Sequence, residues 1–351
     1  MAEENQTTHK RRVRYSGKYP KKFEEKYKEL QPEKYKDTNE HVIKKGNTPA
    51  GMHISIMVNE ILDFLKIQPG ETGFDATLGY GGHTKAMLQC LKGQGHIYAT
   101  DVDPEESART RKRLEEAGFG EDILTIRLQN FCTIDEIAKE AGGFDFILAD
   151  LGVSSMQIDN PKRGFSFKVD GPLDLRLNQE AGISAAERLA AITKDELAGM
   201  LYENSDEPYC EELAKAITDE IRKGNRIDTT TKLRNIIEKT LDFLPEKEKK
   251  DTIKKTCQRT FQALRIDVNR EFEVLYEFME KLPDALKPGG RAAILTFHSG
   301  EDKLVKKALK EGYRAGIYAD YAKDVIRPSA QECAQNGRAR STKMRWAIKA
   351  E

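Results

Sequence analysis

The sequence predicts an α/β fold in which an open, mostly parallel sheet carries an inserted block of helices. Short apolar runs alternate with helical segments. This pattern is typical of strands that helices cover on both faces. A glycine-rich turn joins the first of these runs to a helix, and a long interval of amphipathic helix separates the fourth strand from the fifth. Ligands of such sheets bind at the carboxyl ends of the strands, so the residues at these ends are the first candidates for a site.

The first turn leads into a helix over residues 84–91 and reads Asp75-Ala76-Thr77-Leu78-Gly79-Tyr80-Gly81-Gly82-His83. Its glycines can take positive φ and let the backbone approach a ligand, and the helix offers its N-terminal amides. The Gly-Lys-Ser/Thr of a phosphate loop and the G-x-G-x-x-G of a dinucleotide site are both absent. Because an acid precedes the glycines, the turn suits a cofactor with an ammonium group and a ribose. We interpret it as a site for S-adenosylmethionine, with an ordinary glycine turn as the alternative.

The second strand is expected over residues 95–101 and ends in Asp101. In βαβ units an acid at this tip accepts hydrogen bonds from a ribose diol, so Asp101 is the ribose candidate, with a solvated strand-end acid as the alternative. Asp103 has a different explanation, because Pro104 follows it and Glu106 takes the third helical position. We predict that Asp103 caps the next helix.

Further strands are expected from the apolar runs over residues 122–131, 143–150, 286–298 and 342–349. The glycine turn, Asp101, Phe131 and Asp150 then all fall at carboxyl ends of strands. We therefore expect them to form one cofactor site.

The interval between the fourth and fifth strands is predicted to be helical. Apolar residues recur there at three and four positions over 184–222 and 231–239. Phe165 and Phe167, in the loop before it, fit either core positions or a platform for a flipped base. The predicted organisation is an extension over 1–48, a core over 49–157 and 264–351, and a helical substrate-recognition domain over 158–263.

Composition limits the partners. The formal net charge is zero, no apolar run approaches the roughly 20 residues that span a bilayer, and the N-terminus lacks a secretory segment. We expect a cytoplasmic protein without membrane contact. The cysteines show no C-x-x-C spacing, so neither a zinc site nor a disulfide framework is indicated; they are Cys90, Cys132, Cys210, Cys257 and Cys333.

Two basic segments suggest RNA. Residues 1–50 contain 13 Lys/Arg against 8 Asp/Glu with aromatic residues interleaved, which fits either an RNA-binding arm or a solvated tail. Near the other end, Arg338, Arg340, Lys343 and Arg345 lie within eight positions, and this denser cluster favours RNA contact.

Several motifs, taken in order, resemble a known family. The most specific are Asp-Leu-Gly-Val-Ser-Ser at 150–155 and Arg-Thr-Phe-Gln-Ala-Leu-Arg-Ile at 259–266. From about residue 53 onward the chain resembles the small-subunit ribosomal RNA cytosine-N4 methyltransferases, called H in bacterial nomenclature. The motifs that carry the resemblance are the glycine turn and residues 101–104, 150–159, 163–167, 171–176, 259–266, 297–302 and 338–341.

The resemblance implies a class I, Rossmann-like, S-adenosylmethionine-dependent methyltransferase that methylates the exocyclic N4 amine of one cytidine in the decoding region. It implies small-subunit ribosomal RNA as the partner and no metal, and leaves a homodimer as one option for the oligomeric state. Asp75 and Gly79 complete the glycine turn. The cofactor residues carried over by resemblance are Gly81, Gly82, His83, Asp101, Phe131, Asp150 and Gln157.

This sequence also departs from the family. The extension over 1–48 has no counterpart in typical members, and the other differences are Asn204, Pro208, Lys255-Thr256, Gly300 and Gly337. The cofactor residues are intact, and the changes lie on the substrate side. A paralogue that acts on another RNA cytidine is therefore an alternative. A factor that binds cofactor and ribosomal RNA without catalysis is another. A DNA amine methyltransferase is disfavoured because the Asn/Asp-Pro-Pro-Tyr/Phe motif is absent after the fourth strand.

Catalysis on such an amine needs positioning and a proton acceptor. The nitrogen lone pair is delocalised into the ring, and orientation of the reactants can contribute roughly 7–11 kcal/mol. The acceptor is assigned to Asp150 or the backbone beside it, with Asp174 and His298 as second candidates. The alternatives are cofactor binding only for Asp150, a strand-end histidine for His298, and a salt bridge to Arg176 for Asp174.

Overall fold

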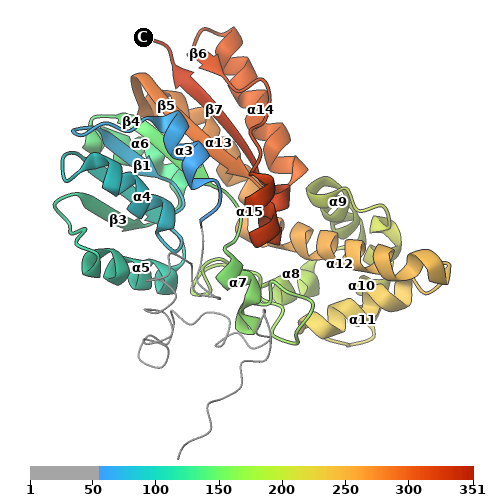
Figure 1. Ribbon diagram of the computed structural model, residues 1–351. Coiled ribbons are helices and arrows are strands. Elements are labelled where there is room, and N and C mark those ends of the chain that lie inside the picture. Colours follow the sequence, from blue (N-terminus) through green and yellow to red (C-terminus); the bar gives the residue numbers. More distant parts are fainter. Residues whose placement is uncertain (1–54) are drawn as a thin grey trace, which may run out of the picture. The chain divides into compact units, whose positions relative to one another are not determined.

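A seven-stranded sheet runs through the part of the chain that the structure describes, residues 55–351 of a computed structural model (Figure 1). The strands are β1 (Thr72–Asp75), β2 (His96–Asp101), β3 (Leu124–Leu128), β4 (Phe144–Asp150), β5 (Leu286–Thr296), β6 (Tyr318–Tyr321) and β7 (Lys343–Lys349). Their order is β3-β2-β1-β4-β5-β7-β6. The first five strands pair in parallel, whereas β7 runs antiparallel to β5 and β6. The extension predicted over residues 1–48 lies outside the described residues.

The expected α/β sheet is confirmed, with one strand more than the sequence predicted. β6 has four residues, of which only Tyr318 is buried, so it carries no apolar run that sequence reading could detect. β3 is shorter than the predicted 122–131, because Phe131 begins a 3-10 helix, η2 (Phe131–Thr133). Phe131 therefore lies on a helical turn directly after the strand.

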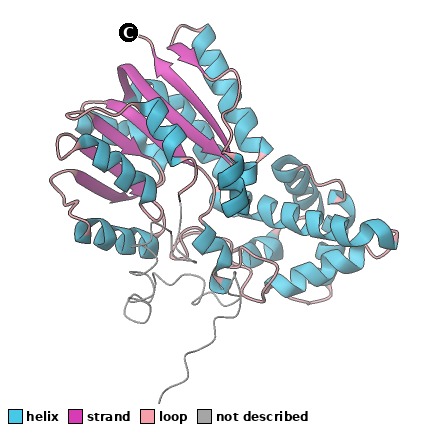
Figure 2. Ribbon diagram, in the orientation of Figure 1, coloured by secondary structure: helices cyan, strands magenta, loops and turns pink. Residues whose placement is uncertain are grey.

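Helices cover both faces of the sheet (Figure 2). On β4, Ile147 and Ala149 belong to one hydrophobic cluster, whereas Phe146 and Leu148 belong to another, as expected because successive side chains of a strand point to opposite faces. The first cluster includes side chains of α6 (Ile134–Ala141), α13 (Glu271–Ala285) and α14 (Ser299–Arg314), and the second those of α3 (Val58–Leu65), α4 (Gly82–Leu91) and α5 (Pro104–Glu116).

The interval between β4 and β5 is helical, as predicted, and has a hydrophobic cluster of its own. Two of its helices begin with capping boxes, Ser184 with Glu187 and Thr193 with Glu196. Figure 1 shows these helices gathered away from the strands. The main ones are α8 (Ala185–Ala191), α9 (Lys194–Ser205), α10 (Cys210–Arg222), α11 (Thr230–Thr240) and α12 (Glu246–Asn269).

Short elements join these parts. They are α7 (Ser155–Asp159) and η3 (Pro161–Arg163) after β4, and α15 (Ala330–Gln335) and η4 (Gly337–Ser341) before β7. Phe165 is buried in the helical cluster, and Phe167 packs against it edge-on to Phe261, with ring centroids 5.6 Å apart. Both aromatic residues therefore take the core alternative rather than an exposed platform.

All five cysteines are free thiols. Within residues 55–351, none of the helices combines the length and apolar character that crossing a bilayer requires.

Two glycine-to-alanine substitutions should have opposite effects on stability. A Cβ on Gly312 of α14 would lie 2.5 Å from the Tyr318 ring, whereas a Cβ on Gly199 of α9 would meet nothing within 4 Å. We expect Gly312→Ala to lower the free energy of unfolding by about 1–3 kcal/mol through overpacking. Gly199→Ala should raise it by about 0.5–1 kcal/mol, because alanine loses less backbone entropy in a helix. Urea denaturation of both variants tests this, and equal effects of the two substitutions would contradict it.

Candidate functional site

Asp75, at the end of β1, fixes the glycine turn against the start of α4. The Thr77 N–H donates to its Oδ1 (3.1 Å), and the Thr84 hydroxyl donates to its Oδ2 (2.6 Å). Burial raises the pKa of Asp75, and the two hydrogen bonds oppose this shift. Both carboxylate oxygens are engaged inside the protein, so Asp75 supports the turn.

The peptide of Gly79 is held on both sides. Its N–H donates to Asp101 Oδ2 (2.7 Å), and its carbonyl accepts from the Thr110 hydroxyl of α5 (2.6 Å). Asp101 Oδ1 also accepts from the Asp103 N–H (2.9 Å), so each Asp101 oxygen makes one bond to the backbone and keeps a second lone pair. Burial raises the pKa of Asp101 to about 6. Asp101 thus joins the turn to the end of β2 and still has the capacity to accept from a ligand hydroxyl.

The next two glycines leave no room for a side chain. Gly81 has a φ of +82°, and a Cβ there would lie 2.6 Å from Thr110, while a Cβ on Gly82 would lie 2.0 Å from the Ser55 hydroxyl. The first intrahelical hydrogen bond of this turn runs from the Lys85 N–H to the Gly81 carbonyl. The N–H groups that open α4 therefore have no acceptor within the helix and can bind an acidic ligand group.

His83 and Asp150 face one another across the turn. Their Nδ1 and Oδ2 atoms are 3.5 Å apart, and His83 Nε2 lies 2.8 Å from the Ile56 carbonyl oxygen. The Asp150 N–H donates to the Thr77 hydroxyl (2.7 Å), whereas Asp150 Oδ1 is buried without a hydrogen-bond partner among the described residues. Burial raises the pKa of Asp150 to about 6, although the charge of His83 opposes the shift. A buried acceptor atom without a donor is costly, so this oxygen marks a place for a ligand donor.

Asp103 does more than the predicted capping. It accepts from the Glu105 and Glu106 N–H groups (3.1 and 3.2 Å), which confirms the cap. Its Oδ2 also accepts from the Gln157 amide (3.0 Å) and from the Arg163 guanidinium. Asp103 therefore ties the cofactor edge of the sheet to the segment that begins the helical insertion.

Gln157 and Phe131 are partly used inside the protein. Gln157 forms a capping box with Ser154 at the start of α7, where the Ser154 N–H donates to Gln157 Oε1 (2.9 Å). Phe131 packs edge-on to Phe278 of α13, with ring centroids 5.2 Å apart. Phe131 follows the carboxyl end of β3, as predicted, whereas Gln157 lies on α7 beyond β4. The cofactor contact of both residues remains a prediction.

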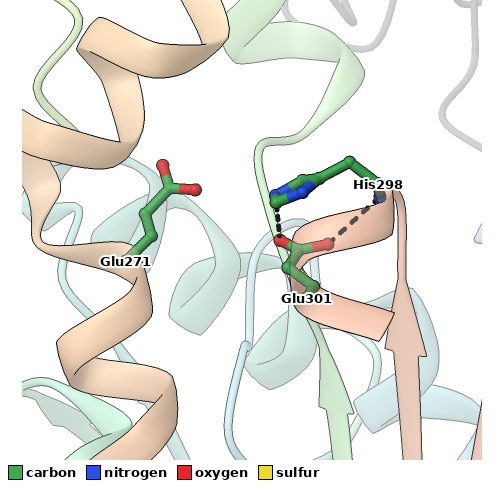
Figure 3. A group of neighbouring side chains, drawn as sticks. All are labelled: Glu271, His298 and Glu301. Carbon is green, nitrogen blue, oxygen red and sulfur yellow. Dashed lines mark hydrogen bonds and ion pairs between the residues drawn. The ribbon is translucent and has the colours of Figure 1, made fainter. Parts of the chain in front are cut away.

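His298 lies after β5 in a charged cluster (Figure 3). Its Nε2 is 3.2 Å from Glu301 Oε1, and Glu301 Oε2 accepts from the Phe297 N–H (2.8 Å). Burial alone would raise the pKa of the Glu301 carboxyl, but His298 and the backbone N–H hold it below its ordinary value. Glu271 points toward the same ring and accepts two hydrogen bonds from Arg265, both 2.8 Å.

Within the described residues, Glu271, His298 and Glu301 form a group whose ligand atoms lie within 4.8 Å of one another. Metal ligation is one use of such a group. Here Arg265 already supplies a positive charge to Glu271, and His298 can supply one to Glu301. The cluster is therefore explained without an ion.

Asp174 has the partner foreseen in its alternative interpretation. Both oxygens accept from the Arg176 guanidinium (2.8 and 2.9 Å), and the Gln179 amide donates to Oδ2 (3.1 Å). Burial alone would raise the pKa of Asp174, but these hydrogen bonds hold it below its ordinary value. A carboxylate so stabilised is a weak proton acceptor, and Asp174 is the least suited of the three candidates.

The C-terminal basic cluster is largely neutralised inside the protein, so its predicted RNA contact needs correction. Arg345 is buried and bonds Asp302 (2.6 Å), to which Lys343 also donates (2.9 Å). Arg338 donates to Asp159 of α7 (2.7 Å). Only Arg340 of the four is exposed. The prediction is wrong for Arg345, because the carboxylate that pairs with it comes from a distant segment that sequence spacing does not show.

Comparison with known proteins identifies the family. The chain matches the MraW methylase family over residues 50–350. It belongs to this family. The protein is therefore a methyltransferase, S-adenosylmethionine is its cofactor, and its sheet is that of the class I enzymes. The match begins at residue 50, so the predicted extension over 1–48 precedes it.

Named relatives agree with this assignment. One from Agathobacter rectalis, named ribosomal RNA small subunit methyltransferase H 1, is 86% identical over the full length of both chains. A second relative, from Alkaliphilus metalliredigens, is named ribosomal RNA small subunit methyltransferase H 2. It is 63% identical, and the alignment covers 97% of each chain. One from Koribacter versatilis, named with H alone, is 36% identical over 85% of this chain and 94% of its own.

The sequence did not clearly indicate two residues that support the candidate site through hydrogen bonds and ion pairs, Thr110 and Glu301. Thr110 gave no signal, because a threonine inside an amphipathic helix is unremarkable in sequence. Glu301 follows His298 at the third position, which is the spacing of a helix start and offered a weak indication.

The Thr110→Val substitution should weaken S-adenosylmethionine binding about 3- to 10-fold, because it removes one hydrogen bond worth about 1 kcal/mol from the Gly79 carbonyl. Isothermal titration calorimetry measures this. Thr125→Val is the matched control, since the Thr125 hydroxyl bonds His96 on β2 and no atom of the turn. Equal affinities in wild type and Thr110→Val would show that this bond does not hold the turn.

The Asp150→Asn substitution should stabilise the free protein at a pH of about 8 by about 1–3 kcal/mol. The Asp150 pKa is about 6 in the folded chain against an ordinary 3.8, so the folded state binds more protons between these values. The contribution of Asp150 to stability therefore falls as the pH rises through this interval and stays unfavourable above it. Urea denaturation should show that the free energy of unfolding of Asp150→Asn increasingly exceeds that of wild type as the pH rises from 3.8 to about 6. A constant difference at every pH would contradict the assignment.

Proposed function

We propose that this protein transfers the methyl group of S-adenosylmethionine to the exocyclic N4 amine of a cytidine in small-subunit ribosomal RNA. The observation that carries the proposal is the unpartnered, buried Oδ1 of Asp150, at the end of β4 beside the glycine turn. The names of the relatives, ribosomal RNA small subunit methyltransferases, support the RNA substrate.

The described residues fit the cofactor. The N–H groups at the start of α4 suit its carboxylate, and the second lone pairs of Asp101 suit its ribose. Gly81 and Gly82 let the turn pack closely against Thr110 and Ser55, where a Cβ would clash. When bound, S-adenosylmethionine supplies an activated methyl group on a sulfonium. The protein's own part is to bind, to orient the amine and to receive a proton.

Asp150 is the best proton acceptor of the three candidates. Its pKa of about 6 lies near neutral pH, where a general base is most effective, and its Oδ1 has no hydrogen-bond partner among the described residues. Asp174 is neutralised by Arg176. His298 is bound to Glu301 and remains a second candidate for the acceptor.

The helical insertion is proposed to recognise the RNA. Arg163 and Gln157 link Asp103 at the cofactor edge to the start of the insertion, so RNA bound there would lie beside the cofactor. A cytoplasmic location fits an enzyme that acts on ribosomal RNA. The boundary over 158–263 and a homodimeric state are parts of the proposal that rest on the sequence.

One alternative is a different target cytidine. The relatives that match nearly the whole chain are numbered H 1 and H 2, whereas the relative named H alone matches 85% of it. Numbered names are compatible with paralogues that differ in the substrate side of the site.

Tritiated S-adenosylmethionine incubated with undermethylated small subunits, followed by nuclease digestion and mass spectrometry, tests the proposal. We expect N4-methylcytidine in the fragment from the decoding region, and a 10²- to 10⁴-fold lower rate for Asp150→Asn. Label in a fragment from any other region would favour the paralogue. Binding of cofactor and subunit without label would favour a non-catalytic factor and overturn the proposal.

A further inference from the structure

The tautomer of His83 is fixed by its surroundings. Its ring is buried, and Nε2 lies 2.8 Å from the Ile56 backbone oxygen. A carbonyl oxygen can only accept a hydrogen bond, so Nε2 must carry a proton. The state of the ring is then decided at the other nitrogen, Nδ1.

Nδ1 faces a second acceptor, Asp150 Oδ2, at 3.5 Å. A neutral His83 would present a lone pair to a carboxylate, and two acceptors would oppose one another. The contact is favourable only when one proton lies between them. With that proton on Nδ1, the pair is an imidazolium beside a carboxylate.

Among the described residues, His83 is the positive group that acts on the carboxylate of Asp150. Asp75 on β1 and Glu301 on α14 both act to raise its pKa, and burial raises it further. The Thr77 hydroxyl accepts a hydrogen bond from the Asp150 backbone N–H and donates none to the Asp150 carboxylate. Only the charge of His83, on α4, favours the ionised form.

We propose that His83 is a positioning residue for Asp150, and that its proton on Nδ1 keeps this half-buried carboxylate charged and oriented with Oδ1 toward the substrate amine. The inference rests on the proposed function. In the reaction the new carbon–nitrogen bond forms as the carbon–sulfur bond breaks, and the electron pair of the broken bond stays on sulfur. One N4 proton passes to Asp150 Oδ1, and the electrons of that N–H bond stay on nitrogen. The sequence predicts that His83 contacts the cofactor. The positioning of Asp150 is a separate role, which that contact does not require.

The His83→Gln substitution tests the inference in the free protein. Glutamine keeps a donor but carries no charge, so Asp150 loses its counter-charge. We expect the ¹³Cγ resonance of Asp150, assigned by its loss in Asp150→Asn, to titrate roughly one pH unit higher than in wild type. The acid limb of the methylation rate should move upward by the same amount. His96→Gln is the matched control, since His96 bonds Asp122 and Thr125 at the start of β2.

The outcomes separate the two claims. An unchanged or lower Asp150 midpoint in His83→Gln, even with weaker cofactor binding, would overturn the role of His83. If that variant does not fold, ¹⁵N shifts of the His83 ring in wild type decide, because the inference requires protons on both Nε2 and Nδ1 where the enzyme is active. A neutral ring there, with its proton on either nitrogen alone, would refute it. If wild type forms no N4-methylcytidine, the proposed function fails, while the titration still shows whether His83 sets the charge of Asp150.

Discussion

The cofactor edge depends on how the three aspartates at strand ends, Asp75, Asp101 and Asp150, are satisfied. A buried carboxylate is costly unless hydrogen bonds compensate it, so each acid gathers backbone or side-chain donors around itself. Asp75 collects Thr77 and Thr84, and Asp101 collects the N–H groups of Gly79 and Asp103. These bonds are also the ones that shape the turn. The geometry of the binding edge is therefore a consequence of satisfying charges that the fold has buried.

The exception in this set explains the chemistry. Asp150 is surrounded by other acids and keeps one oxygen without a donor, so it has a raised pKa and a remaining capacity to accept a proton. This arrangement lowers the stability of the free protein at neutral pH. Such a cost is typical of active sites, where groups are held ready for a ligand that supplies the missing partner. His298, by contrast, has its Nε2 atom 3.2 Å from the carboxylate of Glu301 inside the protein.

A further constraint is the link between the sheet and the helical insertion. Asp103 holds α5 at its start and, through Gln157 and Arg163, the segment that leaves β4. Arg338 from the C-terminal segment binds the same short helix at Asp159. The strand ends, the start of the insertion and the C-terminus are thus joined by ion pairs and hydrogen bonds around one position. A proposed RNA site on the insertion would be held in a fixed relation to the cofactor edge.

Strands β1 to β5 and β7, the cap at Asp103, the helical insertion and the family could all be predicted from sequence, because they depend on local patterns of apolar spacing, turn chemistry and motif. The sequence also brought Gly79, Asp101 and Asp150 to one edge, since parallel strands share their carboxyl ends. Tertiary structure decided which acid is free and which is neutralised. Asp174 and Arg345 are fully paired, whereas Asp150 faces His83 with Oδ2 and has no donor at Oδ1. Charge pairing and burial depend on segments far apart in the chain, and no local spacing encodes them.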